Sequence, residues 1–127
     1  MIKIGITGSL ASGKTTASRI LSYKNGPLFS ADKIVKELYK RKHINDLIRK
    51  KLRINKKDNV KKSVKKMILE DLKNISKIEK IIHPLIRKRM KSFTSKHKNK
   101  KLLFYEIPLL IESKLMNFFD LIIFVKS

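Results

Sequence analysis

The sequence predicts a parallel α/β fold, with a sheet of about four strands, flanking helices and a helical insertion. Short apolar segments alternate with longer segments of helical spacing along the chain. The first apolar segment runs into a glycine-containing loop that precedes a helix pattern. The last two apolar segments, Leu102–Ile107 and Asp120–Val125, have the length of buried strands and fall short of the ~18 residues of a membrane span.

The strands follow from their apolar residues and from the turn signals beside them. Met1–Thr7 alternates too little for an exposed strand, so we expect a buried one that ends at Gly8. Leu28–Ser30 follows the turn signal Asn25-Gly26-Pro27 and is predicted to form a second, short strand. The continuous apolar run of Leu102–Ile107 predicts a central strand, and Asp120–Val125 predicts the last strand.

The helices follow from apolar spacing and end signals. The first predicted helix, Lys14–Ser22, is expected to bury Ala17, Ile20 and Leu21. Asp58 or Asn59 can cap a later helix, because both side chains accept hydrogen bonds from free backbone N–H groups. Its predicted buried face comprises Val60, Val64, Met67, Ile68 and Leu72. The other predicted helices are Asp32–Arg41, Ile44–Leu52 and Ile75–Ile82. A new helix is expected to begin at His83-Pro84 and to fade at Ser95–Lys101, and Pro108–Leu115 is expected to form a turn and a short helix.

The chain is strongly basic, with 127 residues, 32 Lys and Arg against 10 Asp and Glu, and a net charge of +22. We expect one domain over residues 1–127. The basic residues are spread along the sequence, which favours a codon bias acting on solvated positions over a nucleic-acid surface; the same charge can steer a polyanionic small substrate. Zero cysteines and the lack of a signal peptide favour a cytoplasmic protein with no membrane partner.

A phosphate-binding loop lies between the first strand and the first helix. Gly8, Ser9, Leu10, Ala11, Ser12, Gly13, Lys14 and Thr15 match G-x-x-x-x-G-K-[ST] in full, and Thr16 follows. In this motif the backbone N–H groups and the lysine bind the β- and γ-phosphates, and the hydroxyl after the lysine holds Mg²⁺. The sequence therefore predicts an ATP site with Lys14 on the phosphates and Thr15 on the metal. The alternative is a glycine-rich turn with a chance lysine.

Two acids lie where parallel strands end. Asp32 follows the second strand and can accept a proton from a substrate hydroxyl, or it caps the next helix. Glu106 ends the third strand, where a second carboxylate can lie near Mg²⁺ or its waters, or it faces solvent. By themselves, His83 is more typical of a helix start than of a catalyst, and Arg87 is more typical of a solvated surface.

Several segments together resemble the dephospho-CoA kinase family, in order and in spacing, over essentially the whole chain. The His-Pro-Leu-Ile and Pro-Leu-Leu-x-Glu segments carry more of the resemblance than the phosphate loop, which many kinases share. The segments are Gly5–Gly8 running into Ser12–Thr16, Ala31-Asp32, His83-Pro84-Leu85-Ile86 and Ile107–Glu112.

The resemblance implies a P-loop kinase-like enzyme that phosphorylates the ribose 3′-hydroxyl of dephospho-CoA with ATP and Mg²⁺, giving coenzyme A and ADP. It assigns catalysis to Asp32 and Lys14, and acceptor binding to a helical region over residues 33–98. The acceptor residues that it implies are Asp32, His83, Arg87, Pro108, Leu109 and Glu112, and the implied metal residues are Thr15 and Glu106.

The sequence departs from the family at two points. Ser30 stands where the family usually has the first Asp of Asp-Ala-Asp. Family members are also longer, so the resemblance predicts a truncated domain that lacks the C-terminal lid and a fifth strand. Asp120–Val125 would then lie beside the first strand as an exposed edge, open to self-association or to a complementary chain. Three functions therefore remain open at this point: the kinase, a nucleotide-binding remnant or split-enzyme half with little activity alone, and a basic nucleic-acid protein.

Overall fold

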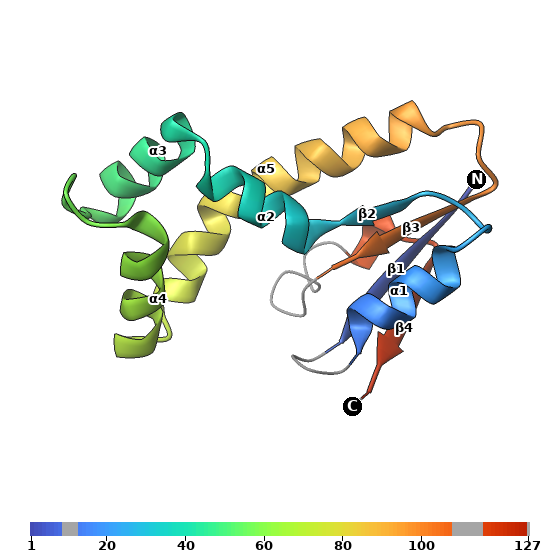
Figure 1. Cartoon of the computed structure of the whole chain (residues 1–127), viewed down its shortest axis with the longest axis horizontal. Coiled ribbons are helices and arrows are strands. Elements are labelled where there is room, and N and C mark those ends of the chain that lie inside the picture. Colours follow the sequence, from blue (N-terminus) through green and yellow to red (C-terminus); the bar gives the residue numbers. More distant parts are fainter. Residues whose placement is uncertain (9–12, 108–115, 127) are drawn as a thin grey trace. The chain divides into compact units, whose positions relative to one another are not determined.

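The computed structural model describes residues 1–8, 13–107 and 116–126. It divides into two units, a sheet unit and a helical unit (Figure 1). The sheet unit comprises Met1–Asp32 and Lys88–Ser127, and the helical unit comprises Lys33–Arg87.

The sheet unit holds a four-stranded parallel sheet in the order β2-β3-β1-β4. The strands are β1 (Ile2–Gly8), β2 (Leu28–Ser30), β3 (Leu102–Glu106) and β4 (Leu121–Val125). This arrangement confirms the predicted parallel α/β class, the central position of the third strand and the placement of the last strand beside the first. Because all strands run the same way, their carboxyl ends share one edge of the sheet, where Glu106 pairs in register with Ile6 and with Ser30.

The two faces of the sheet bury different side chains. Ile4, Ile6 and Phe104 form the buried core of one face, and Leu21 of α1 (Lys14–Ser22) packs against it. The other face holds an aromatic cluster around Tyr105, whose hydroxyl shares a 2.5 Å hydrogen bond with Thr94 Oγ1. The rings in contact in this cluster are Phe29, Phe93, His97, Tyr105, Phe118 and Phe119.

The expected buried face of α1 is partly wrong. Ile20 is 67% exposed, whereas Ser18 and Ser22 are buried. Small serine side chains allow a helix to approach a sheet closely, and here their hydroxyls donate to the backbone carbonyls of Lys14 and Arg19. Since both hydroxyls find acceptors inside their own helix, burying them carries little desolvation penalty.

The helical unit is formed by α2 (Ala31–Tyr39), α3 (Lys42–Leu52), α4 (Val60–Glu70) and α5 (Asn74–Lys96), of which α2 begins and α5 ends in the sheet unit. Asn59 caps α4, since its side chain accepts from Lys62 N at 3.0 Å. Leu72 follows the end of α4 and is 72% exposed, so its predicted burial is wrong. Buried apolar residues of this unit are Leu38, Ile44, Ile48, Leu52, Val60, Val64, Ile82 and Ile86.

The predicted helix boundary at His83-Pro84 is also wrong, because α5 continues through Pro84. Proline lacks the N–H that would bond to the Lys80 carbonyl, which normally weakens a helix at that point. Ile82, His83 and Ile86 are buried around this turn, while Pro84 itself is exposed. Burial of that face on both sides of the proline holds the helix together.

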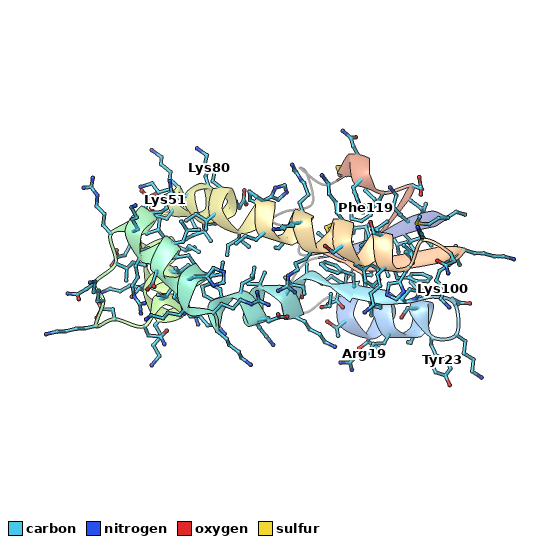
Figure 2. All side chains as sticks on the ribbon, turned by 90° about the horizontal axis from the view of Figure 1, so that it is seen from above. Arg19, Tyr23, Lys51, Lys80, Lys100 and Phe119 are labelled. Atoms are coloured by element: carbon cyan, nitrogen blue, oxygen red, sulfur yellow. The ribbon has the colours of Figure 1, made fainter. Side chains whose placement is uncertain are left out.

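Basic side chains project from both units. Figure 2 shows Arg19 and Lys100 extending from the sheet unit, and Lys51 and Lys80 from the helical unit. Within the described residues no helix is long and apolar enough to cross a membrane. The short helix predicted at Pro108–Leu115 lies outside the described residues.

Candidate nucleotide-binding site

The predicted phosphate loop begins at the carboxyl end of β1 and ends at the first turn of α1. Gly13 has φ 81° and ψ 17°, a left-handed conformation that glycine adopts without a steric penalty. Its carbonyl accepts from Ala17 N at 2.9 Å, which starts α1. The N–H groups of the first turn have no acceptor within an α-helix and lie at the positive end of its dipole, so this end of α1 suits an anion. Ser9, Leu10, Ala11 and Ser12 lie outside the described residues.

Thr15 and Glu106 meet on one face of the sheet. Glu106 lies two residues after Phe104 in β3, so its side chain points to the same face, which α1 covers. Thr15 Oγ1 donates a 3.0 Å hydrogen bond to Glu106 Oε2. Glu106 is only 2% exposed, which contradicts the alternative of a solvent-facing acid. A buried carboxylate beside a hydroxyl at the start of α1 presents two oxygen atoms of the type that Mg²⁺ prefers.

Lys14 and Asp32 also lie together. Lys14 Nζ is 3.5 Å from Asp32 Oδ2, and the side chains are 12% and 45% exposed. Asp32 occupies the first turn of α2, directly after β2. The sheet therefore brings four of the predicted residues, Lys14, Thr15, Asp32 and Glu106, to the carboxyl edge of its strands.

The predicted acceptor residues are only partly described. His83 is 6% exposed and accepts from Arg87 Nη2 at 3.4 Å through its Nδ1 atom, one turn along α5 in the helical unit. Pro108, Leu109 and Glu112 lie outside the described residues. Thr16 is exposed on α1. The acceptor roles of His83, Arg87, Pro108, Leu109 and Glu112 stay predictions, as does the role of Thr16 in binding the nucleotide.

Sequence reasoning missed a polar pocket in the helical unit, which Asn45 and Arg49 help to line. Each directly follows a buried apolar residue of α3, Ile44 and Ile48 respectively. This i, i+4 pair of hydrogen-bonding side chains beside the buried stripe was the available signal. It is weak, because the rest of the pocket comes from the neighbouring helices α2 and α4, whose packing against α3 the local sequence does not specify.

Comparison with known proteins identifies the family. A family model described as dephospho-CoA kinase matches residues 2–127. The chain belongs to the dephospho-CoA kinase family. Its membership confirms the resemblance inferred from the phosphate loop, Ala31-Asp32 and the two more specific segments.

Curated members of the family come from several bacteria. A dephospho-CoA kinase of Rickettsia typhi is 39% identical over 123 residues, which cover 97% of this chain and 64% of that protein. Those of Bartonella quintana and Fusobacterium nucleatum are 37% and 34% identical, and each alignment covers 98% of this chain and 66% of the relative. This chain thus spans less than two thirds of the length of the first of these relatives.

A solved structure supports the fold. A crystal structure of a Thermus thermophilus protein matches 98% of this chain and 65% of its own, with a TM-score of 0.79 and 23% sequence identity. At that identity the match establishes the α/β architecture.

Proposed function

We propose that this chain carries out the dephospho-CoA kinase reaction, in which ATP phosphorylates the ribose 3′-hydroxyl of dephospho-CoA to give coenzyme A and ADP. The observation that carries the proposal is the meeting of Lys14, Thr15, Asp32 and Glu106 at the start of α1, in a chain that belongs to this family. Nucleotide-binding residues and a candidate base for the acceptor lie within one unit, as transfer between two bound substrates requires.

Lys14 and the N-terminus of α1 are suited to the triphosphate. The lysine side chain is 12% exposed, and in this structure its ammonium group faces the Asp32 carboxylate. With ATP bound, the ammonium group would contact the β- and γ-phosphates and offset the charge that shifts to the leaving ADP. The free N–H groups of α1 would bind the same oxygens.

Asp32 is suited to the acceptor hydroxyl. Its carboxylate is nearly half exposed, so a substrate hydroxyl can reach it. In the transfer, the hydroxyl oxygen forms a bond to the γ-phosphorus as the bond from that phosphorus to the β–γ bridging oxygen breaks. The proton of the hydroxyl passes to Asp32, or Asp32 orients the hydroxyl until the proton leaves.

The residues present also fit Mg²⁺. The Thr15 hydroxyl and the Glu106 carboxylate are hard oxygen donors held 3.0 Å apart, and Mg²⁺ commonly takes one or two protein oxygens together with waters and substrate phosphates. Bound there, Mg²⁺ would offset negative charge on the phosphates. Thr15 and Glu106 would hold it directly or through water. The proposal includes a cytoplasmic location, which the lack of cysteine supports.

The test is a turnover assay of the full 127-residue chain with Mg-ATP and dephospho-CoA, read by mass spectrometry of coenzyme A. We expect product from the parent chain and a loss of about 10²–10⁴-fold in Asp32→Asn, the range for removal of a general base. ATP binding should be unchanged in Asp32→Asn and weakened in Lys14→Ala. Glu70→Gln is the control, because it removes an exposed carboxylate of α4 in the helical unit.

Each alternative outcome has a meaning. Measurable ATP binding without coenzyme A formation would contradict the kinase proposal for this chain and favour a nucleotide-binding remnant or one half of a split enzyme. Equal loss of turnover and of ATP binding in Asp32→Asn would contradict its role as the base. DNA binding with a steep salt dependence and no effect of nucleotide would favour the nucleic-acid alternative.

We also propose that the 127-residue chain self-associates through β4. This strand lies at the edge of the described sheet, and Leu121 and Phe124 are 52% and 49% exposed. Exposed apolar edges favour pairing with another strand. Sedimentation should show mass rising with concentration, and Phe124→Lys should reduce it. A single monomeric species at high concentration in the parent chain would contradict the proposal.

A further inference from the structure

A pocket in the helical unit is lined mainly by basic and amide side chains. Its volume is about 340 Å³, within the range of small-molecule sites and roughly ten times the ~30 Å³ share of one water in the liquid. It lies among α2, α3 and α4, and it is therefore formed by residues of one unit. The lining residues are Lys36, Tyr39, Lys40, Asn45, Arg49, Asn59, Val60 and Lys61.

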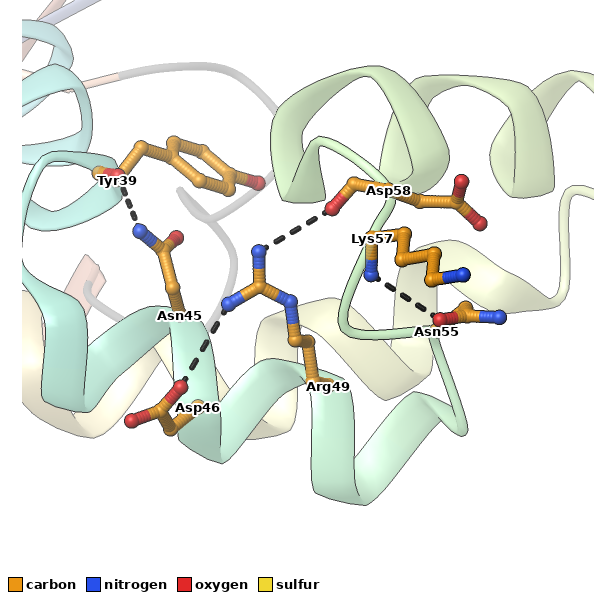
Figure 3. Close-up of polar contacts among 7 residues, drawn as sticks. All are labelled: Tyr39, Asn45, Asp46, Arg49, Asn55, Lys57 and Asp58. Carbon is orange, nitrogen blue, oxygen red and sulfur yellow. Dashed lines mark hydrogen bonds and ion pairs between the residues drawn. The ribbon is translucent and has the colours of Figure 1, made fainter.

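The Arg49 guanidinium is held in place on two sides. Nη2 donates to the Asp58 carbonyl at 3.2 Å, and Nη1 lies 3.6 Å from Asp46 Oδ1 (Figure 3). The side chain is 24% exposed. Its Nε atom is buried and has no hydrogen-bond partner among the described residues. The contacts of Nη1 and Nη2 therefore fix the orientation of the Nε–H group, which has no acceptor among the described residues.

Asn45 lies one turn before Arg49 on α3, and Figure 3 shows the two side chains beside each other. Its Nδ2 donates to the Tyr39 carbonyl at 2.9 Å, which fixes the orientation of the amide. The buried Oδ1 atom then has no donor among the described residues. Buried polar atoms are rarely left without partners, so two such atoms one turn apart indicate a missing ligand or ordered water.

The electrostatics of the lining favour an anion. Lys36, Lys40 and Lys61 are exposed, and none of them forms an ion pair within the described parts of the chain. The Asp46 carboxylate offsets only the charge of Arg49. Burial raises the pKa of Tyr39, so its hydroxyl stays protonated at neutral pH. The lining thus offers several donors and an excess of positive charge around a small volume.

We propose that this pocket binds the diphosphate group of a small molecule. A diphosphate offers enough oxygens for cations on α3 and α4 and along α2 at once, and a volume of about 340 Å³ exceeds what one phosphate fills. Its oxygens would accept from Arg49 Nε and from the lysines, and a protonated oxygen or a bound water would donate to Asn45 Oδ1. Two sources share this chemistry: the diphosphate of dephospho-CoA and that of a separate metabolite.

The test is a titration of the full chain with inorganic pyrophosphate, without Mg²⁺, read by NMR at the Arg49 Nε–H and the Asn45 side-chain amide. Lys14→Ala serves as the background, because the phosphate loop would also bind pyrophosphate. We expect saturable shifts of both signals. The double variant Lys36→Gln/Lys40→Gln should weaken binding by about tenfold or more, as loss of charged hydrogen-bond donors does.

The matched control is Lys50→Gln/Lys65→Gln, which removes two exposed lysines of α3 and α4 that do not line the pocket. It should change the affinity by less than about twofold, the effect of screened charges outside the site. Equal weakening by both double variants would mean diffuse attraction to a basic protein and would overturn the proposal, as would shifts that never saturate. All four lysines are exposed, so none of these variants should unfold the chain.

Competition identifies the source. If dephospho-CoA displaces pyrophosphate from the Arg49 signal, the pocket binds the acceptor. If dephospho-CoA leaves that signal unchanged while ADP displaces pyrophosphate, the pocket binds a separate diphosphate. The result does not depend on turnover, so failure of the kinase proposal and failure of this one are distinguishable.

Discussion

The sheet unit and the helical unit fix their polar side chains in different ways. In the sheet unit, hydrogen-bonded register fixes the strand ends, and side-chain alternation in β3 turns Glu106 toward Thr15. In the helical unit, Arg49 is oriented by a side chain three residues away and by a carbonyl of the loop before α4. The first arrangement is built into the backbone, whereas the second depends on how separate helices pack. Changes to packing should therefore affect the two units differently.

The largest expected effect is on packing in the helical unit. Ile48 is fully buried in α3, so Ile48→Ala should lower the free energy of unfolding by about 2–5 kcal/mol. Its neighbour Leu47 is 38% exposed, and Leu47→Ala should cost about 1 kcal/mol or less. Urea unfolding followed by circular dichroism measures both. If the two variants lose equal stability, α3 does not pack as described.

In the sheet unit, the next largest effect is expected on turnover, when the charge of Glu106 is removed. Glu106→Gln keeps an oxygen that can accept from Thr15 but removes the charge, so turnover should fall about 10- to 100-fold, the usual cost of losing a group that supports a metal site. Glu79→Gln on α5 is the control, with turnover unchanged. Turnover equal to the parent in Glu106→Gln would remove Glu106 from the proposed site.

Pro84 lies inside α5, where the low helix propensity of proline is unfavourable. Pro84→Ala restores an N–H for the Lys80 carbonyl within α5. Removing the proline relieves a helix penalty of about 3 kcal/mol in the folded state. Alanine also gives the unfolded chain more conformational freedom, which lowers the stability by about 1 kcal/mol. We therefore expect the free energy of unfolding, measured by thermal unfolding, to rise by about 1–2 kcal/mol. Ser92→Ala, at an exposed position later in α5, should change stability by less than about 0.5 kcal/mol. A loss of stability in Pro84→Ala would show that the proline ring itself makes a needed contact.

The sequence was sufficient wherever one local pattern decides the structure. The helix Lys14–Ser22 and the strand Leu28–Ser30 were predicted to the residue, because a complete motif and a turn signal mark their ends. The predicted break at Pro84 and the predicted burial of Ile20 were wrong, because tertiary packing outweighed a local rule. The contacts of Lys14 with Asp32 and of Thr15 with Glu106 could be expected only as proximity at a sheet edge. The pocket around Arg49 could not be predicted, since it depends on how three consecutive helices pack against one another, which no local pattern specifies.

The smallest expected effect concerns the departure of Ser30 from the family. Ser30 pairs in register with Glu106, so Ser30→Asp would place a second carboxylate beside a buried one on the neighbouring strand. Like charges on directly paired positions destabilise a sheet by up to about 1 kcal/mol. Mg²⁺, which binds carboxylate oxygens, should offset that repulsion. Differential scanning fluorimetry should show a lower Tm for Ser30→Asp in EDTA, with the difference from the parent chain reduced by millimolar Mg²⁺. Ser92→Asp, at an exposed position of α5, is the control and should show no such dependence on Mg²⁺. If millimolar Mg²⁺ raises the Tm of neither Ser30→Asp nor the parent chain, the Glu106 edge does not attract a divalent cation, and the assignment of the metal to Thr15 and Glu106 is wrong.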